Sequence, residues 1–522
     1  MKLTIGLKVT HRLESGHQRA AFHWIACAAT VALTACGGGG GGDSQSGVPT
    51  GSPPSPTTFT ASFQVAGLAP GKQVVLAFNA FSTAVSANGK FDSSFPPFYE
   101  GMSYEASVVT QPTSQVCAIA NRRGTTSRAN LTFAVTCAQT PETVLHAMRV
   151  ADGNSTNSPL MQADDGNFYG TAPEGGAYGQ GTVFRITPQG VFSVLYSFGG
   201  ISQRDGLVPM GALVQGKNGH LYGTTSGGGV SNNNGTVFEM TLDGSMTILY
   251  TFGSKPYDAA APQAGLILAS DGNFYGTASV GGLHGGGAVF KATPAGDVTV
   301  LYSFGGIGSG DGANPTSALM QGADGNFYGT TEQGGATSPQ QNYGTVYRVT
   351  PAGVGTVLYS FGATAGDGRF PQAGLVQSSD GNFYGTTLSG GANSSGTIFR
   401  LSPAGVFETF YSFGADLDDG RAPVGSLLVG PNGSLYGTTA AGGVGGGLAG
   451  GAVAVGTVFR VKPDRSGVVL YTFGVTNDGL TNDGTAPRAG LISGRDGNLW
   501  GITPSGGDFF GGVVFSISGS SL

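Results

Sequence analysis

The 522-residue sequence predicts an all-β fold in which a seven-bladed β-propeller with four-stranded blades, residues 140–522, follows a small β-sandwich, residues 58–139. Three observations predict this fold. A pattern of four short strands recurs seven times, Gly supplies 95 residues while only 10% are charged, and the repeat region opens on a strand that its last repeat lacks. Aromatic residues add 10%, so the chain has enough apolar surface to fold.

Residues 1–35 are typical of an export signal. Four basic residues precede an apolar run over 20–33, which is shorter than the roughly 20 residues of a membrane span. The run ends in LTAC at residues 33–36, which resembles the bacterial lipobox. That resemblance implies cleavage before Cys36, a diacylglycerol on its sulfur and, with Gly37 next, the outer membrane as destination. A plain secretory signal is the alternative.

The segment after Cys36 is predicted to be a flexible tether, because residues 36–57 are rich in Gly, Ser and Pro. Cys27 lies in the segment that would be removed, which leaves Cys117 and Cys137 as one pair. We expect a disulfide between them in an oxidising compartment, and two buried free thiols are the alternative.

Residues 58–139 alternate apolar and polar residues in short runs and show no helical period. Asn88-Gly89 is a hairpin turn signal between two of these runs. We therefore predict a disulfide-linked β-sandwich. It resembles the immunoglobulin-like modules that bacterial surface proteins place between anchor and head.

The repeat is clearest from Gly374 to Gly414, which reads GLVQSSDGNFYGTTLSGGANSSGTIFRLSPAGVFETFYSFG. Its four predicted strands are A (374–377), B (382–387), C (397–402) and D (409–413). Asp-Gly or Asn-Gly marks the A–B turns, and Thr-Pro-x-Gly marks the C–D turns at 187–190, 293–296 and 350–353. Both signals predict tight hairpins. The glycine that opens strand C recurs at steps of 52 to 60 residues: Gly181, Gly235, Gly287, Gly344, Gly396, Gly456 and Gly512.

The phase of the repeats predicts a closed ring. The first recognisable element is a D-type strand at Val144–Met148, and the last is a C-type strand over 512–517 with no D strand after it. Pairing the two would complete the seventh blade and remove open sheet edges.

The motifs GTVFRITP, VLYSFGG, DGANP and DGNFYGTT resemble the GloVer tandem repeat of bacterial exported proteins, and the resemblance covers residues 142–522. It implies a surface-anchored propeller and brings no catalytic chemistry with it. The seventh repeat departs most from the pattern, with Trp500, Ile502 and Phe509-Phe510 where the others have Tyr, Thr and small residues.

Composition and motifs exclude several functions. A net charge of −6 with only 24 Lys and Arg argues against nucleic acid as a partner. Strand A carries no carboxylate, His or Cys, so we expect no metal, no cofactor and no catalytic residue there. The Asp-Gly turns could suggest calcium, but turn formation is the better interpretation. Two sets of recurring polar residues could either bind a ligand or serve the fold. Hydrogen bonding to backbone groups is favoured over a polar ring for Gln162, Gln215, Gln321 and Gln377. Packing between blades is favoured over a sugar platform for Tyr169, Tyr222, Tyr275, Tyr328, Tyr384 and Tyr436.

The loops at one end of the blades, which we call the loop end, are the candidate binding face. The B–C loops vary in length from 388–396 to 440–456, and variable loops on a rigid scaffold are where binding usually occurs. The DGxxP loops that join D to the next A share this end, and their carboxylates either bind a cation or sugar or only order their turns. The candidate residues are Tyr178, His284, Tyr343, Phe509, Phe510, Asp205, Asp311, Asp367, Asp419 and Asp483.

The sequence therefore predicts a monomeric, lipid-anchored binding module at the cell envelope, whose partner is a glycan or an envelope protein. A propeller enzyme acting on extracellular polysaccharide is one alternative, and a purely structural envelope scaffold is another. In the enzyme alternative, carboxylates would come from the loops, with these candidates: Asp416, Asp418, Asp419 and Glu332.

Overall fold

The computed structural model describes residues 58–519 and shows an all-β protein. Within that span, residues 80, 93–94, 111–114, 120–122, 140–141, 201–203, 231–232, 336–341, 365, 417–418, 444–454 and 475–482 are not described. The predicted signal, the tether and Cys36 lie outside the described residues, as does most of the long loop at 440–456. No helix within the described ranges has the length and hydropathy of a membrane span.

Residues 58–139 form two four-stranded sheets that share one hydrophobic core. The sheet orders are β4-β1-β8-β6 and β3-β2-β5-β7, and every pair is antiparallel except β1 with β8. Phe63 and Val65 of β1 are buried while Gln64 between them is exposed, as expected for a strand with one face on a core. The strands are β1 (Ala61–Ala66), β2 (Val74–Phe78), β3 (Phe81–Val85), β4 (Gly89–Asp92), β5 (Ser103–Thr110), β6 (Gln115–Ile119), β7 (Arg123–Thr125) and β8 (Leu131–Gln139).

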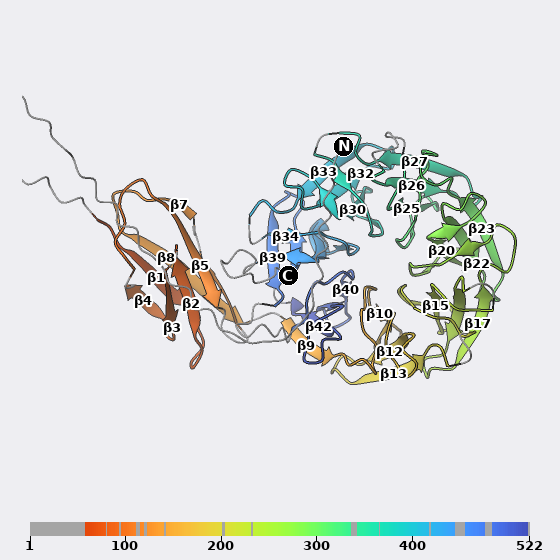
Figure 1. Ribbon diagram of the computed structural model, residues 1–522, viewed down its shortest axis with the longest axis horizontal. Coiled ribbons are helices and arrows are strands. Elements are labelled where there is room, and N and C mark those ends of the chain that lie inside the picture. Colours follow the sequence, from red (N-terminus) through yellow and green to blue (C-terminus); the bar gives the residue numbers. More distant parts are fainter. Residues whose placement is uncertain are drawn as a thin grey trace, which may run out of the picture. The chain divides into compact units, whose positions relative to one another are not determined.

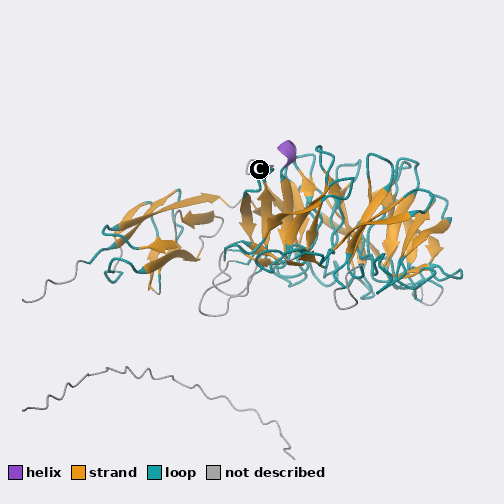
Figure 2. Ribbon diagram, turned by 90° about the horizontal axis from the view of Figure 1, so that it is seen from above, coloured by secondary structure: helices purple, strands orange, loops and turns teal. Residues whose placement is uncertain are grey.

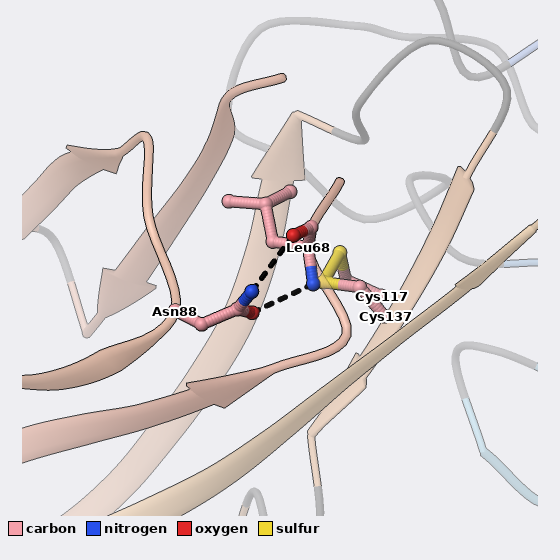
Figure 3. The surroundings of a disulfide bond; sticks show 4 residues. All are labelled: Leu68, Asn88, Cys117 and Cys137. Atoms are coloured by element: carbon pink, nitrogen blue, oxygen red, sulfur yellow. Dashed lines mark hydrogen bonds between the residues drawn. A yellow bond between two sulfur atoms is a disulfide. The ribbon is translucent and has the colours of Figure 1, made fainter. Parts of the chain in front are cut away.

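A disulfide joins two neighbouring strands of the first sheet. Cys117 of β6 and Cys137 of β8 lie opposite each other, with their Cα atoms 3.9 Å apart (Figure 3). The predicted pairing is confirmed, and the alternative of two free thiols is wrong. Both cysteines belong to the buried core between the sheets, so the bond braces the centre of this region.

The hairpin predicted at Asn88-Gly89 is wrong. β3 pairs with β2, whereas β4 pairs with β1 in the other sheet, so the segment between β3 and β4 crosses from one sheet to the other. The Asn88 side chain accepts a hydrogen bond from the Leu68 N–H (2.7 Å) and donates one to the Leu68 carbonyl (2.8 Å; Figure 3). The amide thus fixes the crossover against the loop that follows β1.

Seven four-stranded antiparallel sheets follow among the described residues. The first four are β10 (Met161–Gln162), β11 (Phe168–Ala172), β12 (Thr182–Ile186) and β13 (Phe192–Ser197); β14 (Val214–Gln215), β15 (Leu221–Thr225), β16 (Thr236–Met240) and β17 (Met246–Thr251); β19 (Ile267–Leu268), β20 (Phe274–Ala278), β22 (Ala288–Ala292) and β23 (Val298–Ser303); and β24 (Met320–Gln321), β25 (Phe327–Thr331), β26 (Thr345–Val349) and β27 (Gly355–Ser360). The last three are β29 (Val376–Gln377), β30 (Phe383–Thr387), β32 (Thr397–Leu401) and β33 (Phe407–Ser412); β35 (Leu428–Val429), β36 (Leu435–Thr439), β38 (Thr457–Val461) and β39 (Gly467–Thr472); and β40 (Ile492–Ser493), β41 (Leu499–Ile502) and β42 (Val513–Ile517) with β9 (Glu142–Ala147).

Each sheet repeats the predicted A–D meander. Strand B is buried along its whole length in all seven sheets, because neighbouring sheets cover both of its faces. A bulge interrupts the C–D pairing after the second residue of strand C in every sheet, as between Val183 and Phe184. Bulges increase local twist, which suits stacked, strongly twisted sheets.

The seventh sheet joins the two ends of the repeat region. β42 pairs antiparallel with β9, so the first strand after residue 140 supplies the missing strand D, as predicted. Figure 1 shows the seven sheets arranged around a ring, with β9 in orange beside β42 in blue. The fold is therefore propeller-like.

Contacts between neighbouring sheets also run around the ring. Where the next sheet has a Phe in strand B, the strand B ring of one sheet packs on it, as Tyr275 does on Phe327 at 4.0 Å. Trp500 of the seventh sheet stacks on Phe168 of the first at 3.8 Å. The predicted packing role of the strand B tyrosines is therefore confirmed, and the seam between the last and first sheets uses the same contact.

The recurring glutamines also join neighbouring sheets. The Nε2 group of Gln215 donates to the Gly219 carbonyl (2.8 Å), and its Oε1 atom accepts from the backbone N–H of Asp164 in the preceding sheet (2.9 Å). Gln162 makes the same bonds to Gly166 and, across the seam, to the N–H of Arg495, both at 2.9 Å. They satisfy backbone groups, as the favoured interpretation expected.

The two ends of the sheets differ in structure. At the turn end lie the A–B and C–D turns, including the 3-10 helix η1 (Pro431–Gly433), which is purple in Figure 2. At the loop end, each D–A loop pairs with the B–C loop of the sheet it enters. Three of these pairs are short ladders, β18 (Ala259–Ala260) with β21 (Val280–Gly281), β28 (Gly368–Arg369) with β31 (Ser389–Gly390), and β34 (Gly420–Arg421) with β37 (Ala441–Gly442). The other four are single bridges, Asn154 with Glu174, Leu207 with Gly227, Ala313 with Gln333, and Thr485 with Ser505.

Candidate binding face

The carboxylates of the DGxxP loops are bound by groups of their own loops and sheets. Each accepts a hydrogen bond from the tyrosine hydroxyl of the preceding strand D and from a backbone N–H just after that strand. The hydroxyl bonds join Tyr196 to Asp205 (2.8 Å), Tyr302 to Asp311 (2.8 Å), Tyr359 to Asp367 (2.8 Å), Tyr411 to Asp419 (3.3 Å) and Tyr471 to Asp483 (2.6 Å). The N–H donors are Gly199, Gly305, Gly362, Gly414 and Gly474. The observed role of these aspartates is to order the loops, and ligand binding by them stays a prediction.

These tyrosines remain protonated donors at neutral pH. Burial, with the adjacent carboxylates acting in the same direction, raises the pKa of Tyr302 and of Tyr411 to about 12. Burial also raises the pKa of Asp367 and Asp419, against the opposing effect of the hydrogen bonds they accept. The Tyr–Asp pairs are therefore half-buried structural contacts.

Sequence reasoning missed two members of this set. Asp258 accepts from the Tyr250 hydroxyl (2.7 Å) and from the Gly253 N–H (2.9 Å). Asp152 accepts from the Arg149 N–H (3.0 Å) and lies 3.0 Å from Nε2 of His146, which replaces the tyrosine in β9. Asp258 lacks the following Gly, so the DG motif does not find it. Its distance in sequence from the strand D tyrosine, the same as for Tyr359 and Asp367, is the signal that could have found it.

The residue before each DGxxP proline has a left-handed backbone, even where it is bulky. Val208 and Phe370 both have φ of 58°, which is rare for such side chains. The Val208 N–H donates to the Gln180 carbonyl of the first sheet, and its carbonyl accepts from Ser226 of the second, both at 3.0 Å. This conformation lets one peptide unit join two neighbouring sheets at the loop end.

The exposed aromatic side chains of the ring all lie at the loop end, within the described residues. Tyr178, Phe509 and Phe510 were predicted there, and Tyr257 of the loop after β17 joins them. His284 is also exposed, in the B–C loop of the third sheet. These residues come from the loops of several sheets.

Two arginines stack on aromatic rings at this end. The Arg369 guanidinium lies 4.4 Å from the centroid of half-buried Tyr343, and the Phe370 ring meets the same tyrosine edge-on at 5.6 Å. The Arg149 guanidinium lies 4.4 Å from the centroid of Phe509. Sequence reasoning missed both arginines, because the loops that bring them to the rings come from neighbouring sheets.

The turn end uses its polar groups internally. Asp271 accepts hydrogen bonds from the backbone and side chain of Asn273 (3.0 and 2.8 Å) and from the Tyr275 hydroxyl (2.8 Å). Burial raises the pKa of Asp271, but these hydrogen bonds outweigh burial and lower it to about 2. The same contacts recur at Asp165, Asp324 and Asp380, which supports the turn interpretation over calcium binding.

Among the residues that the structure describes, the carboxylates named for the enzyme alternative do not come together in one catalytic group. Glu332 accepts hydrogen bonds from the side-chain amides of Gln372 (2.8 Å) and Asn314 (2.7 Å). Asp416 is exposed, and Asp418 lies outside the described residues. Among the residues that are described, no three His, Cys, Asp or Glu side chains are grouped to hold a metal ion.

The fold and the loop end define a class of protein: a propeller-like repeat ring whose ends are joined in one sheet. The sequence matches the Gloeobacter/Verrucomicrobia repeat over residues 103–339 and 269–448, which is more than half of the chain. The chain therefore belongs to this repeat family. No curated protein matches it.

Several solved structures are similar to the chain at low identity. The extracellular domain of a hybrid two-component system from B. thetaiotaomicron matches at 11% identity and a TM-score of 0.46, over 77% of this chain and 45% of that one. A protein described as a 6-phosphogluconolactonase from Bacteroides uniformis matches at 17% and 0.40, over 66% and 93%. A puromycin hydrolase matches at 13% and 0.42, over 68% and 50%. The chain thus spans less than half of the first of these proteins.

Proposed function

We propose that this protein is an exported, lipid-anchored binding module of the cell envelope. In this proposal residues 1–35 are the signal peptide, 36–57 the tether, 58–139 an immunoglobulin-like β-sandwich and 140–522 a seven-bladed β-propeller. The chain acts as a monomer, and its loop end binds a glycan or an envelope protein. Membership of the repeat family and the Cys117–Cys137 disulfide, which suits an oxidising compartment, support export.

One observation carries the binding role. All four exposed aromatic side chains of the described part of the ring, Tyr178, Tyr257, Phe509 and Phe510, lie at the loop end. The exposed apolar residues at the turn end are valines at or beside the C–D turns, such as Val354 and Val406. Aromatic side chains on loops held by a rigid scaffold are typical of binding surfaces.

A comparison of the two ends tests this function. The purified full chain is applied to a glycan array and to immobilised envelope proteins, and any bound glycan is also followed for turnover. We expect retention without turnover, at least about tenfold weaker in a Y178S/Y257S variant and unchanged in a V354S/V406S variant. Turnover would instead support the enzyme alternative, and equal binding by both variants would remove the loop end from the function.

The anchor is tested separately. We expect the wild-type chain to incorporate labelled fatty acid in a bacterial host and to fractionate with the outer membrane. A C36S variant should lose the label and be recovered without the membrane. Incorporation that persists in C36S would contradict the proposed lipid site.

A further inference from the structure

The B–C loop of the seventh sheet carries an unusual tip. Two residues before the strand C glycine, the backbone is left-handed in five loops. Four of them have Gly179, Asn233, Gly285 or Ser394 there, which are small residues or ones common in this conformation, whereas the seventh sheet has Phe510 with φ of 60°. The Phe510 side chain is 69% exposed, so core packing does not explain the choice of residue. Bulky residues held in such conformations cluster at functional sites.

The tip belongs to a larger apolar arc. Exposed apolar side chains continue through the loops of the next three sheets around the ring. Val150, in the loop after β9, is exposed beside the tip, and its carbonyl accepts from the Gly176 N–H of the first sheet (2.8 Å), which ties the tip to the next loop. The apolar arc consists of Phe509 and Phe510, Tyr178, Val230, Tyr257 and Leu283.

The charges of the apolar arc indicate which partner it fits. Each of three D–A loops carries one exposed cation and one carboxylate: Arg149 and Asp152, Arg204 and Asp205, and Lys255 and Asp258. Asp508, next to the Phe pair, adds another exposed carboxylate. The arc therefore has no excess of positive charge, which argues against anionic lipids or polyanions as the main attraction. The two Phe rings carry no hydrogen-bonding group, so their exposed surface suits an apolar partner.

The chain before residue 58 supplies a second argument. Residues 36–57 span at most about 75 Å when fully extended, so a lipid on Cys36 would keep the folded part close to a bilayer. A local bilayer surface would be present at high effective concentration, so weak insertion of a few side chains would suffice.

We propose that the apolar arc docks on the surface of a zwitterionic lipid bilayer, with Phe509 and Phe510 inserted below the headgroups. This goes beyond the proposed function by adding a bilayer contact at the loop end, and it rests on the lipid anchor of that proposal. Arg149, stacked on Phe509, lies where a guanidinium can reach lipid phosphates while its stem stays apolar. Apolar insertion rather than charge drives the contact, so binding persists at high salt.

A fluorescent probe at two matched positions tests this proposal. V150C and V406C each place one thiol-reactive, environment-sensitive dye on the full chain reconstituted in phosphatidylcholine vesicles. Val150 lies beside the Phe pair and Val406 at the turn end, with exposures of 65% and 71%. Quenching by brominated lipid reports whether each dye lies within the bilayer.

We expect strong quenching of the dye at position 150, unchanged at high salt, and none at position 406. Adding F509S/F510S to V150C should reduce the ratio of quenched to unquenched dye at least about tenfold, because each buried Phe favours insertion by more than that factor. Adding V354S/V406S to V150C should leave quenching unchanged, which controls for loss of apolar surface. Far-UV circular dichroism confirms that each variant is folded.

Two outcomes would overturn the docking proposal: an unquenched dye at position 150, or equal quenching at positions 150 and 406. The proposed function is judged independently by the glycan array and envelope proteins. If the dye at position 150 stays in water while the loop end still retains a glycan or an envelope protein in those assays, membrane docking fails and the binding function stands. If the dye is not quenched and no ligand is retained, both the docking proposal and the binding function fail.

Discussion

Six sheets of the ring are built from consecutive strands, whereas the seventh is assembled from the two ends of the repeat region. The closing sheet keeps the backbone features of the others, namely the same strand order and the same bulge in strand C. It differs in side chains, with Trp500 and His146 where the other sheets carry tyrosines, and with Glu142 at a position that is apolar or Gly elsewhere. Backbone register, more than side-chain identity, thus defines how the ring closes.

Truncating the rings that stack between sheets should give the largest effect. Trp500 stacks across the seam, and Tyr275 makes the equivalent stack inside the ring. Both are fully buried, so W500A and Y275A should each lower the free energy of unfolding by about 3–5 kcal/mol. Denaturant unfolding followed by circular dichroism compares them. A W500A cost below about 1 kcal/mol beside a large Y275A cost would show that the seam is not packed like the other junctions.

Glu142 should make the closing sheet sensitive to pH. Burial, with repulsion from Asp483 acting in the same direction, raises the pKa of Glu142 from 4.5 to about 8. The folded chain thus retains a proton that the unfolded chain releases. The stability from protonated Glu142 is complete below pH 4.5 and is lost as the pH rises to about 8.

E142Q keeps a neutral side chain at every pH. Its stability relative to wild type should therefore grow through this window, by as much as about 5 kcal/mol, in unfolding titrations at successive pH values. Parallel stability curves for the two proteins would refute a buried, protonated Glu142.

The interior and seam glutamines should have smaller and equal effects. Gln215 bonds a backbone N–H of the first sheet, and Gln162 bonds the Arg495 N–H across the seam, at the same distance. Q162A and Q215A each leave one N–H without its partner, so each should cost about 1 kcal/mol in the same unfolding assay. A neutral Q162A beside a destabilising Q215A would indicate a looser seam.

Restoring the tyrosine of the other sheets should have the smallest effect. His146 stacks on Phe192 at 4.0 Å, as Tyr359 stacks on Phe407 at 3.7 Å, and both face an aspartate. H146Y should therefore change the free energy of unfolding by no more than about 0.5 kcal/mol. A larger loss would mean that the closing sheet needs histidine at this position.

The repeat architecture could be predicted because its signals are periodic. Strand patterns, turn motifs and the phase of the first and last strands together predicted the β9–β42 pairing. Asn88-Gly89 was misinterpreted because a local turn signal does not say which sheet the next strand joins. The buried carboxyl of Glu142 was missed because its surroundings come from the neighbouring sheet, far away in sequence.

The candidate face was predictable in position but not in detail. Chain topology alone placed the B–C and D–A loops at one end, and Tyr178, Phe509 and Phe510 are exposed there. The arginines over Tyr343 and Phe509 depend on contacts between loops of different sheets. The Tyr–Asp bonds likewise depend on how a loop folds back on its own strand, which the DG motif does not encode.

A cross-link between β9 and β42 tests the closed ring most directly. Thr143 and Ser516 are cross-strand partners, as Cys117 and Cys137 are in the first sheet of residues 58–139. In an oxidised T143C/S516C chain, digestion and mass spectrometry should find the peptides of positions 143 and 516 joined within one molecule. Free thiols at both positions under conditions that preserve the Cys117–Cys137 bond, or cross-links only between molecules, would contradict the closed ring.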